Sequence, residues 1–176
     1  MSNRNGTAYA LTTYARVESG QADALDAYLA ALPTGTGSPF ARLAGVHLAR
    51  VQVFRELVHQ GPHQRPDPLR HAHLVVSTTF NGGLDEHLAA LAERVPECDE
   101  WWGHCVGYPG RQDRAAFAAY VRSIQRRTSL FSTPFPTATV DDVNDSIALR
   151  ARVIEFAAAS QHLDAEDLHR RFLEAF

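Results

Sequence analysis

The chain has 176 residues, of which 45% are hydrophobic and 21% are charged, and its formal charge is −3. This composition is typical of one globular domain and excludes a disordered or collagen-like chain. All 17 basic residues are arginine, which excludes lysine Schiff bases and the lysine of a P-loop. The negative net charge gives no indication of nucleic-acid binding. Two cysteines are too few for a disulfide framework, and no segment resembles a signal peptide or a membrane span. We therefore expect a cytoplasmic protein that binds neither nucleic acid nor a membrane.

Four segments are rich in the β-branched and aromatic residues that favour strands. They span residues 9–17, 46–54, 71–80 and 129–136. The fourth segment contains two prolines, which suit the edge of a sheet better than its centre. Gly61 and three prolines predict a long connection between the second and third strands, over residues 55–70.

Apolar residues at helical spacing predict amphipathic helices over residues 25–32, 84–95 and 117–124. Thr139 and Asp142 form a capping-box pattern, which predicts a long helix over residues 140–159. Asp164 is placed to cap a last helix that carries Leu168 and Phe172. Residues 96–110 are aromatic, polar and irregular, and they predict an inserted segment rather than a regular element.

The order strand, helix, strand, strand, helix, strand predicts a ferredoxin-like βαββαβ fold of the α+β class. Its four-stranded sheet is antiparallel, and such a sheet covers one face with helices and leaves the other bare. The predicted core spans residues 8–136, and helices over residues 139–176 extend it within a single domain of residues 1–176.

Side chains alternate along a strand, so the second and third strands divide into two faces. The more apolar face is expected under the helices. The other face mixes polar and apolar side chains, namely Leu48, Arg50, Gln52 and Phe54 on the second strand and His71, His73, Val75, Ser77 and Thr79 on the third. A mixed surface of this kind suits a pocket lining, and the alternative is an ordinary exposed face.

His73 and Arg50 are the candidate catalytic residues on this mixed face. An imidazole is the natural proton shuttle near neutral pH, and a guanidinium here needs an anionic partner, either an internal carboxylate or an acidic group of a ligand. His71 and His73 have the spacing of a metal pair, but no third ligand supports one, so no metal is expected and surface histidines are the alternative. If the two strands pair along their full length, Arg50 and His73 come within reach of one ligand, and the arginine lowers the pKa of the histidine.

The further candidates for substrate binding are Gln52, Ser77, Trp101, His104 and Tyr108. The last three lie in a dense aromatic segment, residues 101–110, whose rings can stack on a ligand or can anchor an irregular loop against the core. Cys105 directly follows His104, and because adjacent side chains rarely meet, a catalytic cysteine is not favoured.

The βαββαβ order and the mixed sheet face resemble the dimeric α+β barrel superfamily, in which two ferredoxin-like sheets meet face to face. The strings VHLARVQVF, LVVSTTFNGGLDEHLAAL and WWGHCVGYPG also resemble a bacterial group of uncharacterised single-domain proteins with this architecture. The superfamily includes cofactor-free monooxygenases, polyketide-modifying enzymes, haem-degrading monooxygenases, chlorite dismutases and dye-decolourising peroxidases. The resemblance covers residues 8–136 as topology and the three strings as sequence.

The resemblance implies a homodimer, which would also bury Leu48, Phe54 and Val75, and a small-molecule enzyme of bacterial specialised metabolism. The reaction that it favours is oxidation, monooxygenase- or peroxidase-like, of a bulky aromatic or anionic substrate, either without a cofactor or with haem. In the haem-degrading members the axial histidine comes from the helix after the third strand, where this chain has His87; a partly exposed position on the helix flank is the alternative. A cyclase or isomerase that uses the same pocket, and a non-catalytic ligand-binding accessory protein, stay open.

Overall fold

The computed structural model describes residues 3–57, 61–62, 65 and 67–176. The chain forms two compact units, Met1–Thr137 and Ala138–Phe176. The first unit contains strands and helices, and the second contains two helices. The expectation of a single domain over residues 1–176 stays a prediction.

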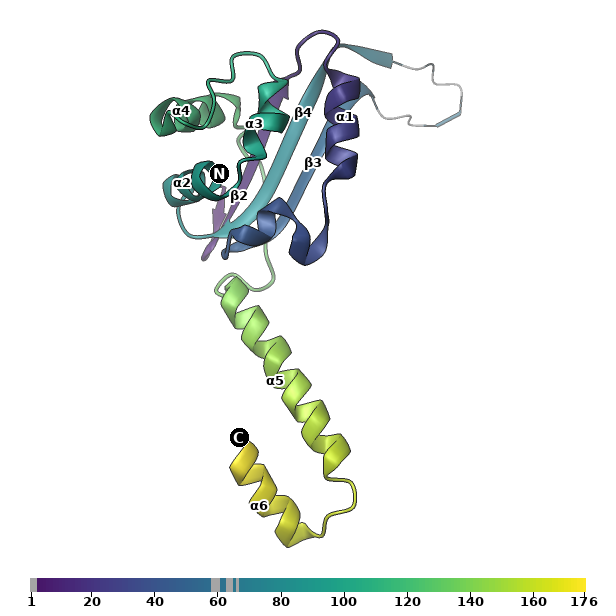
Figure 1. The fold of residues 1–176 in the computed structure, drawn as a ribbon, viewed down its shortest axis with the longest axis vertical. Coiled ribbons are helices and arrows are strands. Elements are labelled where there is room, and N and C mark those ends of the chain that lie inside the picture. Colours follow the sequence, from purple (N-terminus) through teal and green to yellow (C-terminus); the bar gives the residue numbers. More distant parts are fainter. Residues whose placement is uncertain (1–2, 58–60, 63–64, 66) are drawn as a thin grey trace. The chain divides into compact units, whose positions relative to one another are not determined.

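The first unit is built on a four-stranded antiparallel sheet (Figure 1). In spatial order its strands are β1 (Arg4–Asn5), β2 (Ala8–Arg16), β4 (Asp67–Asn81) and β3 (Val46–Leu57). The predicted α+β class and the antiparallel four-stranded sheet are therefore confirmed. Because β4 pairs with both β2 and β3, it lies inside the sheet and sets the register of both neighbours.

The two longest strands, β3 and β4, pair further than the sequence predicts. Leu57 pairs with Asp67, so both strands extend into the connection expected over residues 55–70. Residues 58–60, 63–64 and 66 of that connection lie outside the described residues. Arg55 fastens the extended β3 to the first helix of the unit, because its guanidinium is paired with Asp23 and Asp26.

The strand predicted over residues 129–136 is not formed. The chain that leads into this segment touches the edge of β2 only briefly: Gln125 forms an isolated antiparallel bridge with Thr13, and the Arg126 amide donates to the Thr12 carbonyl at 2.7 Å. The two prolines of the segment have no N–H to continue such a ladder.

The edge position is taken by β1, which folds back on β2 through a turn at Gly6. Gly6 has a φ of 59°, and a Cβ at this position would collide with the carbonyl oxygen of Pro136. The same carbonyl accepts a 2.8 Å hydrogen bond from the Thr7 amide. Residues 129–136 therefore end on the β1–β2 turn instead of forming the fourth predicted strand.

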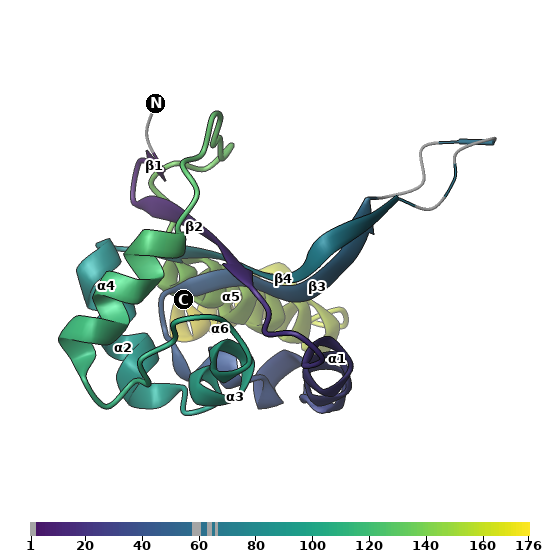
Figure 2. The same cartoon turned by 90° about the horizontal axis from the view of Figure 1, so that it is seen from above.

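Helices α1 (Ala22–Ala31), α2 (Leu84–Arg94), α3 (Cys98–Gly103) and α4 (Arg114–Ile124) all lie on one side of the sheet (Figure 2). Two short 3-10 turns, η1 (Gly35–Gly37) and η2 (Pro39–Arg42), connect α1 to β3. The core lies between this helical layer and the sheet, and its largest fully buried side chains include Trp101, Trp102, Phe80, Phe117 and Leu11. Helix α3 falls in the segment that the sequence pattern marks as irregular.

Asp99 fixes the aromatic segment that follows α3. Its carboxylate accepts hydrogen bonds from the Tyr108 hydroxyl at 2.7 Å, from the Arg111 amide at 3.1 Å and from the Arg111 Nε at 3.0 Å. Burial and the neighbouring carboxylate raise the pKa of Tyr108, so its hydroxyl stays protonated and donates. The segment is thus anchored to the core by one carboxylate.

The second unit is a hairpin of helices α5 (Val140–Ala159) and α6 (Ala165–Ala175). Its caps are the predicted ones: Thr139 and Asp142 form a capping box at α5, and Asp164 accepts from the first amides of α6. Among the described residues, no helix of either unit is long and apolar enough to span a bilayer.

Replacement of Asp99 tests whether its carboxylate anchors the aromatic segment to the core. We expect Asp99→Ala to lower the free energy of unfolding by about 2–3 kcal/mol, because it leaves the Tyr108 hydroxyl and Arg111 without their shared acceptor. The neighbouring Glu100→Ala should change the unfolding free energy by less than about 0.5 kcal/mol, since Glu100 is exposed. Urea unfolding followed by tryptophan fluorescence measures both, and equal values for the two variants would contradict the role of Asp99.

Candidate functional site

The sheet face turned away from α1–α4 is the candidate site, and we name it the open face (Figure 2). Its side chains come from β2, β4 and β3 in four cross-strand rows: Ala10–Thr79–Leu48, Thr12–Ser77–Arg50, Tyr14–Val75–Gln52 and Arg16–His73–Phe54. On β4 the intervening side chains, Leu74, Val76, Thr78 and Phe80, are buried under the helices. The alternation predicted for these strands therefore agrees with the register.

His73 lies in the last of these rows and is partly buried. Its ring stacks on the Tyr14 ring, with centroids 4.4 Å apart and an angle of 15° between the planes. Its Nδ1 atom is buried and has no hydrogen-bond partner among the described residues. Burial lowers the pKa of His73 below its usual value, a hydrogen bond to the backbone of His71 partly opposes this effect, and nearby positive groups lower the pKa further. The imidazole is therefore neutral at pH 7.

Tyr14 and two arginines complete the surroundings of His73. Arg126 follows α4, and its guanidinium lies over the Tyr14 ring, 5.6 Å from the centroid. Arg16 lies directly opposite His73 in the sheet register. Neither arginine is paired with a carboxylate among the described residues. We name Tyr14, Arg16, His73 and Arg126 the Tyr14–His73 cluster.

Arg50 lies on the open face as predicted, but it is not beside His73. Arg50 pairs with Ser77, and His73 is four residues further along β4, about 13 Å at the rise of a strand. The lowered pKa of His73 therefore has other causes than Arg50: burial first, then the charges of His71, Arg16 and Arg126. The expectation that Arg50 lies close enough to lower the pKa of His73 is corrected by this register, whereas contact of both residues with one ligand stays a prediction.

Gln52 and Ser77, two of the predicted binding residues, share the open face with His73. Gln52 lies opposite Val75, and the Ser77 hydroxyl is 3.4 Å from that of Thr12. Both are partly buried. A ligand that touched both Arg50 and His73 would have to lie across the row of Gln52, which separates them.

The other predicted binding residues, Trp101, His104 and Tyr108, lie in α3 and the loop after it, on the helical side of the sheet (Figure 2). Trp101 is fully buried and stacks on Phe40 with 5.4 Å between centroids. His104 Nδ1 lies 3.0 Å from Gln21 Oε1, and Tyr108 donates to Asp99. These contacts give the segment an anchoring role, which is the alternative that the sequence leaves open.

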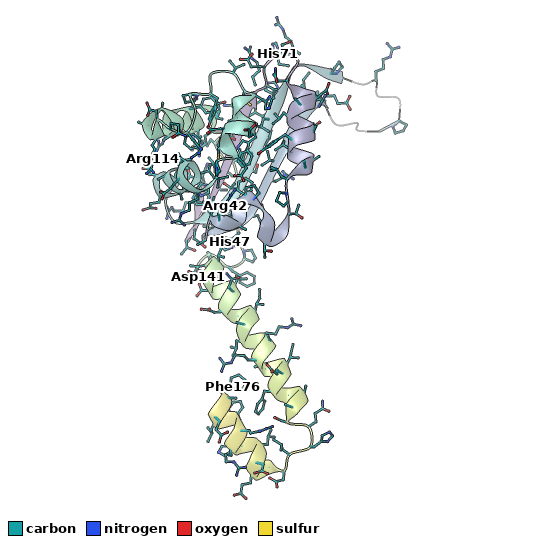
Figure 3. All side chains as sticks on the ribbon, in the orientation of Figure 1. Arg42, His47, His71, Arg114, Asp141 and Phe176 are labelled. Atoms are coloured by element: carbon teal, nitrogen blue, oxygen red, sulfur yellow. The ribbon has the colours of Figure 1, made fainter. Side chains whose placement is uncertain are left out.

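Neither the cysteines nor the paired histidines form a reactive centre. Burial raises the pKa of Cys105 to about 12 and that of Cys98 well above its usual value, so neither thiol is ionised at pH 7. His71 is exposed, at the end of the sheet opposite to His47 (Figure 3). In the part of the chain that the structure describes, no three His, Cys, Asp or Glu side chains are arranged to hold a metal ion.

His87 on α2 faces the sheet, so the exposed position considered for it is wrong. Its side chain is 7% exposed, its ring stacks on Phe80 with 3.6 Å between centroids, and its Nε2 lies 3.4 Å from the Thr78 hydroxyl. The cavity beside it measures about 200 Å³, which is smaller than the roughly 300–1,000 Å³ of ordinary ligand pockets. These residues do not fit a haem with His87 as its axial ligand, because the ring is packed against Phe80 and Thr78 of β4 and the space is too small.

Tyr14, Arg16 and Arg126 are residues that the sequence analysis does not single out. Alternation along residues 9–17 places Tyr14 and Arg16 on one face, and the pairing of β2 with β4 makes this the face of His73. That signal was present in the sequence. No sequence pattern positions Arg126, because its place depends on how the chain leaves α4.

The pKa of His73 shows whether Arg126, as in the structure, or Arg50, as expected from the sequence, lies near its imidazole. We expect Arg126→Gln to raise the pKa of His73 towards its usual value, because a positive charge near the imidazole is removed. Arg50→Gln, a change of the same type on the same face, should leave the midpoint unchanged. NMR of the imidazole C–H protons measures each midpoint. An upward shift in Arg50→Gln but not in Arg126→Gln would restore the arrangement expected from the sequence.

The burial of His87 predicts a loss of stability in acid. Burial lowers the pKa of His87 to about 4, whereas an unfolded histidine titrates at about 6.5. The unfolded state therefore takes up the proton first, and the free energy of unfolding falls by about 3 kcal/mol as the pH decreases from about 6.5 to about 4. Urea unfolding across this range should show a shallower decline in His87→Gln than in wild type, while His47→Gln keeps the wild-type slope. Parallel curves for all three proteins would contradict the buried neutral state.

Comparison with known proteins adds no assignment to this site. No protein-family model, no curated protein and no solved structure matches the chain. The chemistry that bears on function is therefore that of the open face: a neutral imidazole, a stacked phenol ring and two guanidinium groups without carboxylate partners among the described residues.

Proposed function

We propose that the chain is a small-molecule enzyme whose open face binds a bulky aromatic anion. The Tyr14–His73 cluster is the observation that supports this proposal. An aromatic ring can extend the existing stack of Tyr14 and His73, and an acidic group can pair with Arg16 or Arg126. Arg50, Gln52 and Ser77 offer further polar contacts to a ligand long enough to cross the sheet.

His73 is the proposed proton acceptor. A neutral imidazole takes a proton from a phenol or an activated C–H through a ring nitrogen that the substrate can reach, and the ring of His73 lies on the open face. A neighbouring guanidinium stabilises the anion that forms.

Oxidation of the deprotonated substrate is the first reaction class that we propose, in the context of bacterial specialised metabolism. Loss of a proton makes an aromatic compound more electron-rich and therefore easier to oxidise. The haem-dependent version is not proposed, since His87 does not fit as an axial ligand. Cyclisation or isomerisation is the second class, because it needs the same proton transfer by His73 and no redox step.

We further propose that a second copy covers the open face, as in the dimeric α+β barrels that the sequence resembles. Leu48 is 72% exposed on this face, which also carries the apolar side chains of Val75 and Phe54 in other rows. In a ferredoxin-like sheet the third strand lies between the first and the second. Here β4 lies between β2 and β3 in the same way, which supports this part of the proposal. Burial under a partner would also strengthen the contact of a guanidinium with an anionic ligand.

The probe 4-nitrophenol tests the site, because it ionises near neutral pH and absorbs visible light only as the phenolate. We expect the protein to bind the phenolate, so that visible absorbance at constant pH rises when protein is added. Arg126→Gln should weaken binding by roughly tenfold, the effect of losing one charge-assisted contact. Arg122→Gln is the matched control, since this arginine is paired with Asp85 and should have no effect.

Each outcome of this titration bears on the assignment. No spectral change with wild-type protein would contradict the site, and equal losses in Arg126→Gln and Arg122→Gln would show that the attraction is not local. A loss in Arg50→Gln alone would place the anion at the other end of the open face.

A further inference from the structure

The open face carries positive charge at two places and no negative charge between them. Arg16 lies in the row of His73, and Arg50 lies two rows away. No side chain in the four cross-strand rows is an aspartate or a glutamate. The whole chain has a formal charge of −3, so these rows are opposite in sign to the chain as a whole. A surface of this kind favours a ligand with more than one acidic group.

The row of Arg50 has the groups of an anion subsite. Arg50 lies directly opposite Ser77, and Ser77 lies opposite Thr12, so a guanidinium and two hydroxyls share one row across three strands. The two hydroxyl oxygens are 3.4 Å apart, and both side chains are partly buried. Arg50 has no carboxylate partner among the described residues. Guanidinium and hydroxyl groups donate to carboxylates, so these three residues, which we name the Arg50 row, can hold an acidic group.

The row between the two cationic rows suits an aromatic body. It contains Tyr14, Val75 and Gln52 and no charged side chain. The Tyr14 ring already stacks on His73, so a ring of the ligand can extend this stack over Val75. Along β4 the open face therefore changes from a cationic row to an uncharged row and back to a cationic row.

We propose that the substrate is an elongated aromatic compound with two acidic groups, one at the Tyr14–His73 cluster and the other at the Arg50 row. This inference rests on the function proposed for the open face, and it names the class of substrate. Ser77 is four residues from His73 along β4, so the two cationic rows are about 13 Å apart. A compound with one acidic group binds more weakly, because it forms only one of the two sets of contacts. Contacts at both ends also fix the position of the ionisable group beside His73.

Two coloured phenols that differ only in a carboxylate test the subsite at the Arg50 row. 4-Hydroxyazobenzene has a single acidic group, and 4-(4-hydroxyphenylazo)benzoate carries a carboxylate at the far end of the same rigid rod. Both compounds absorb at longer wavelength as phenolates, so absorbance at constant pH measures their binding to the full chain. We expect the carboxylate to strengthen binding to the wild-type chain by about tenfold, the effect of one charge-assisted contact.

Two arginine variants locate the two acidic groups. Arg50→Gln should remove the tenfold difference by weakening only the binding of the carboxylate compound. Arg50 is exposed and has no ion-pair partner among the described residues, so this variant should keep its fold, which circular dichroism checks. Arg126→Gln should weaken both compounds to a similar degree, because the phenolate lies at that end. Arg122→Gln is the matched control, since Arg122 is paired with Asp85 and should affect neither compound.

The outcomes separate this subsite from the proposed function. Equal binding of the two compounds to the wild-type chain, or a difference that persists in Arg50→Gln, overturns the subsite at the Arg50 row. Phenolate binding that is lost in Arg126→Gln would still support the proposed function in either case. No absorbance change with either compound contradicts the proposed function and the subsite together.

Discussion

The pairing of β4 with β2 on one side and β3 on the other is the constraint on which the first unit depends. Side chains alternate across a strand, so this single register decides for three strands at once which residues face the helices. All four helices of the unit then lie on the apolar face, where Leu74, Val76 and Phe80 are buried. The opposite face is not covered by a described helix of the unit, and it carries arginine and histidine side chains.

The same register explains why His73 has a perturbed environment on a face without helices. The ring is held between Arg16 and Phe54 across the sheet and is stacked on Tyr14 one row away. This crowding removes water from the imidazole without giving Nδ1 a partner, and loss of water disfavours the charged form. A neutral histidine near cationic side chains is the arrangement on which the proposed acid–base role of His73 depends.

The two units differ in how far they bury their apolar side chains. The first unit closes a core around Trp101, Trp102 and Phe117, and Asp99 holds the irregular segment that completes it. The hairpin has regular helices with well-formed caps, yet caps stabilise helix ends and cannot replace a core. No residue of α5 or α6 is buried, and the contacts of Phe156 with the rings of Phe172 and Phe176 join the two helices.

The sequence by itself determined the local features of this protein. Alternation and helical spacing located the three long strands and the helices other than α3, and the short-range hydrogen bonds of Thr139, Asp142 and Asp164 set the starts of α5 and α6. These features were predictable because they depend on residues within one or two turns. The strand over residues 129–136 was predicted wrongly because local composition does not show that β1 takes the edge of β2 through the turn at Gly6.

Only the tertiary structure decided the candidate site. Arg50 and His73 were correctly placed on one face, but their separation depends on the strand register, which no local pattern sets when the connecting loop is long. Arg126 reaches Tyr14 across more than a hundred residues of sequence, and His87 is buried because α2 packs on Phe80. The physical reason is the same in each case: propensity and periodicity act between neighbours in the chain, whereas a site is made by side chains that only packing brings together.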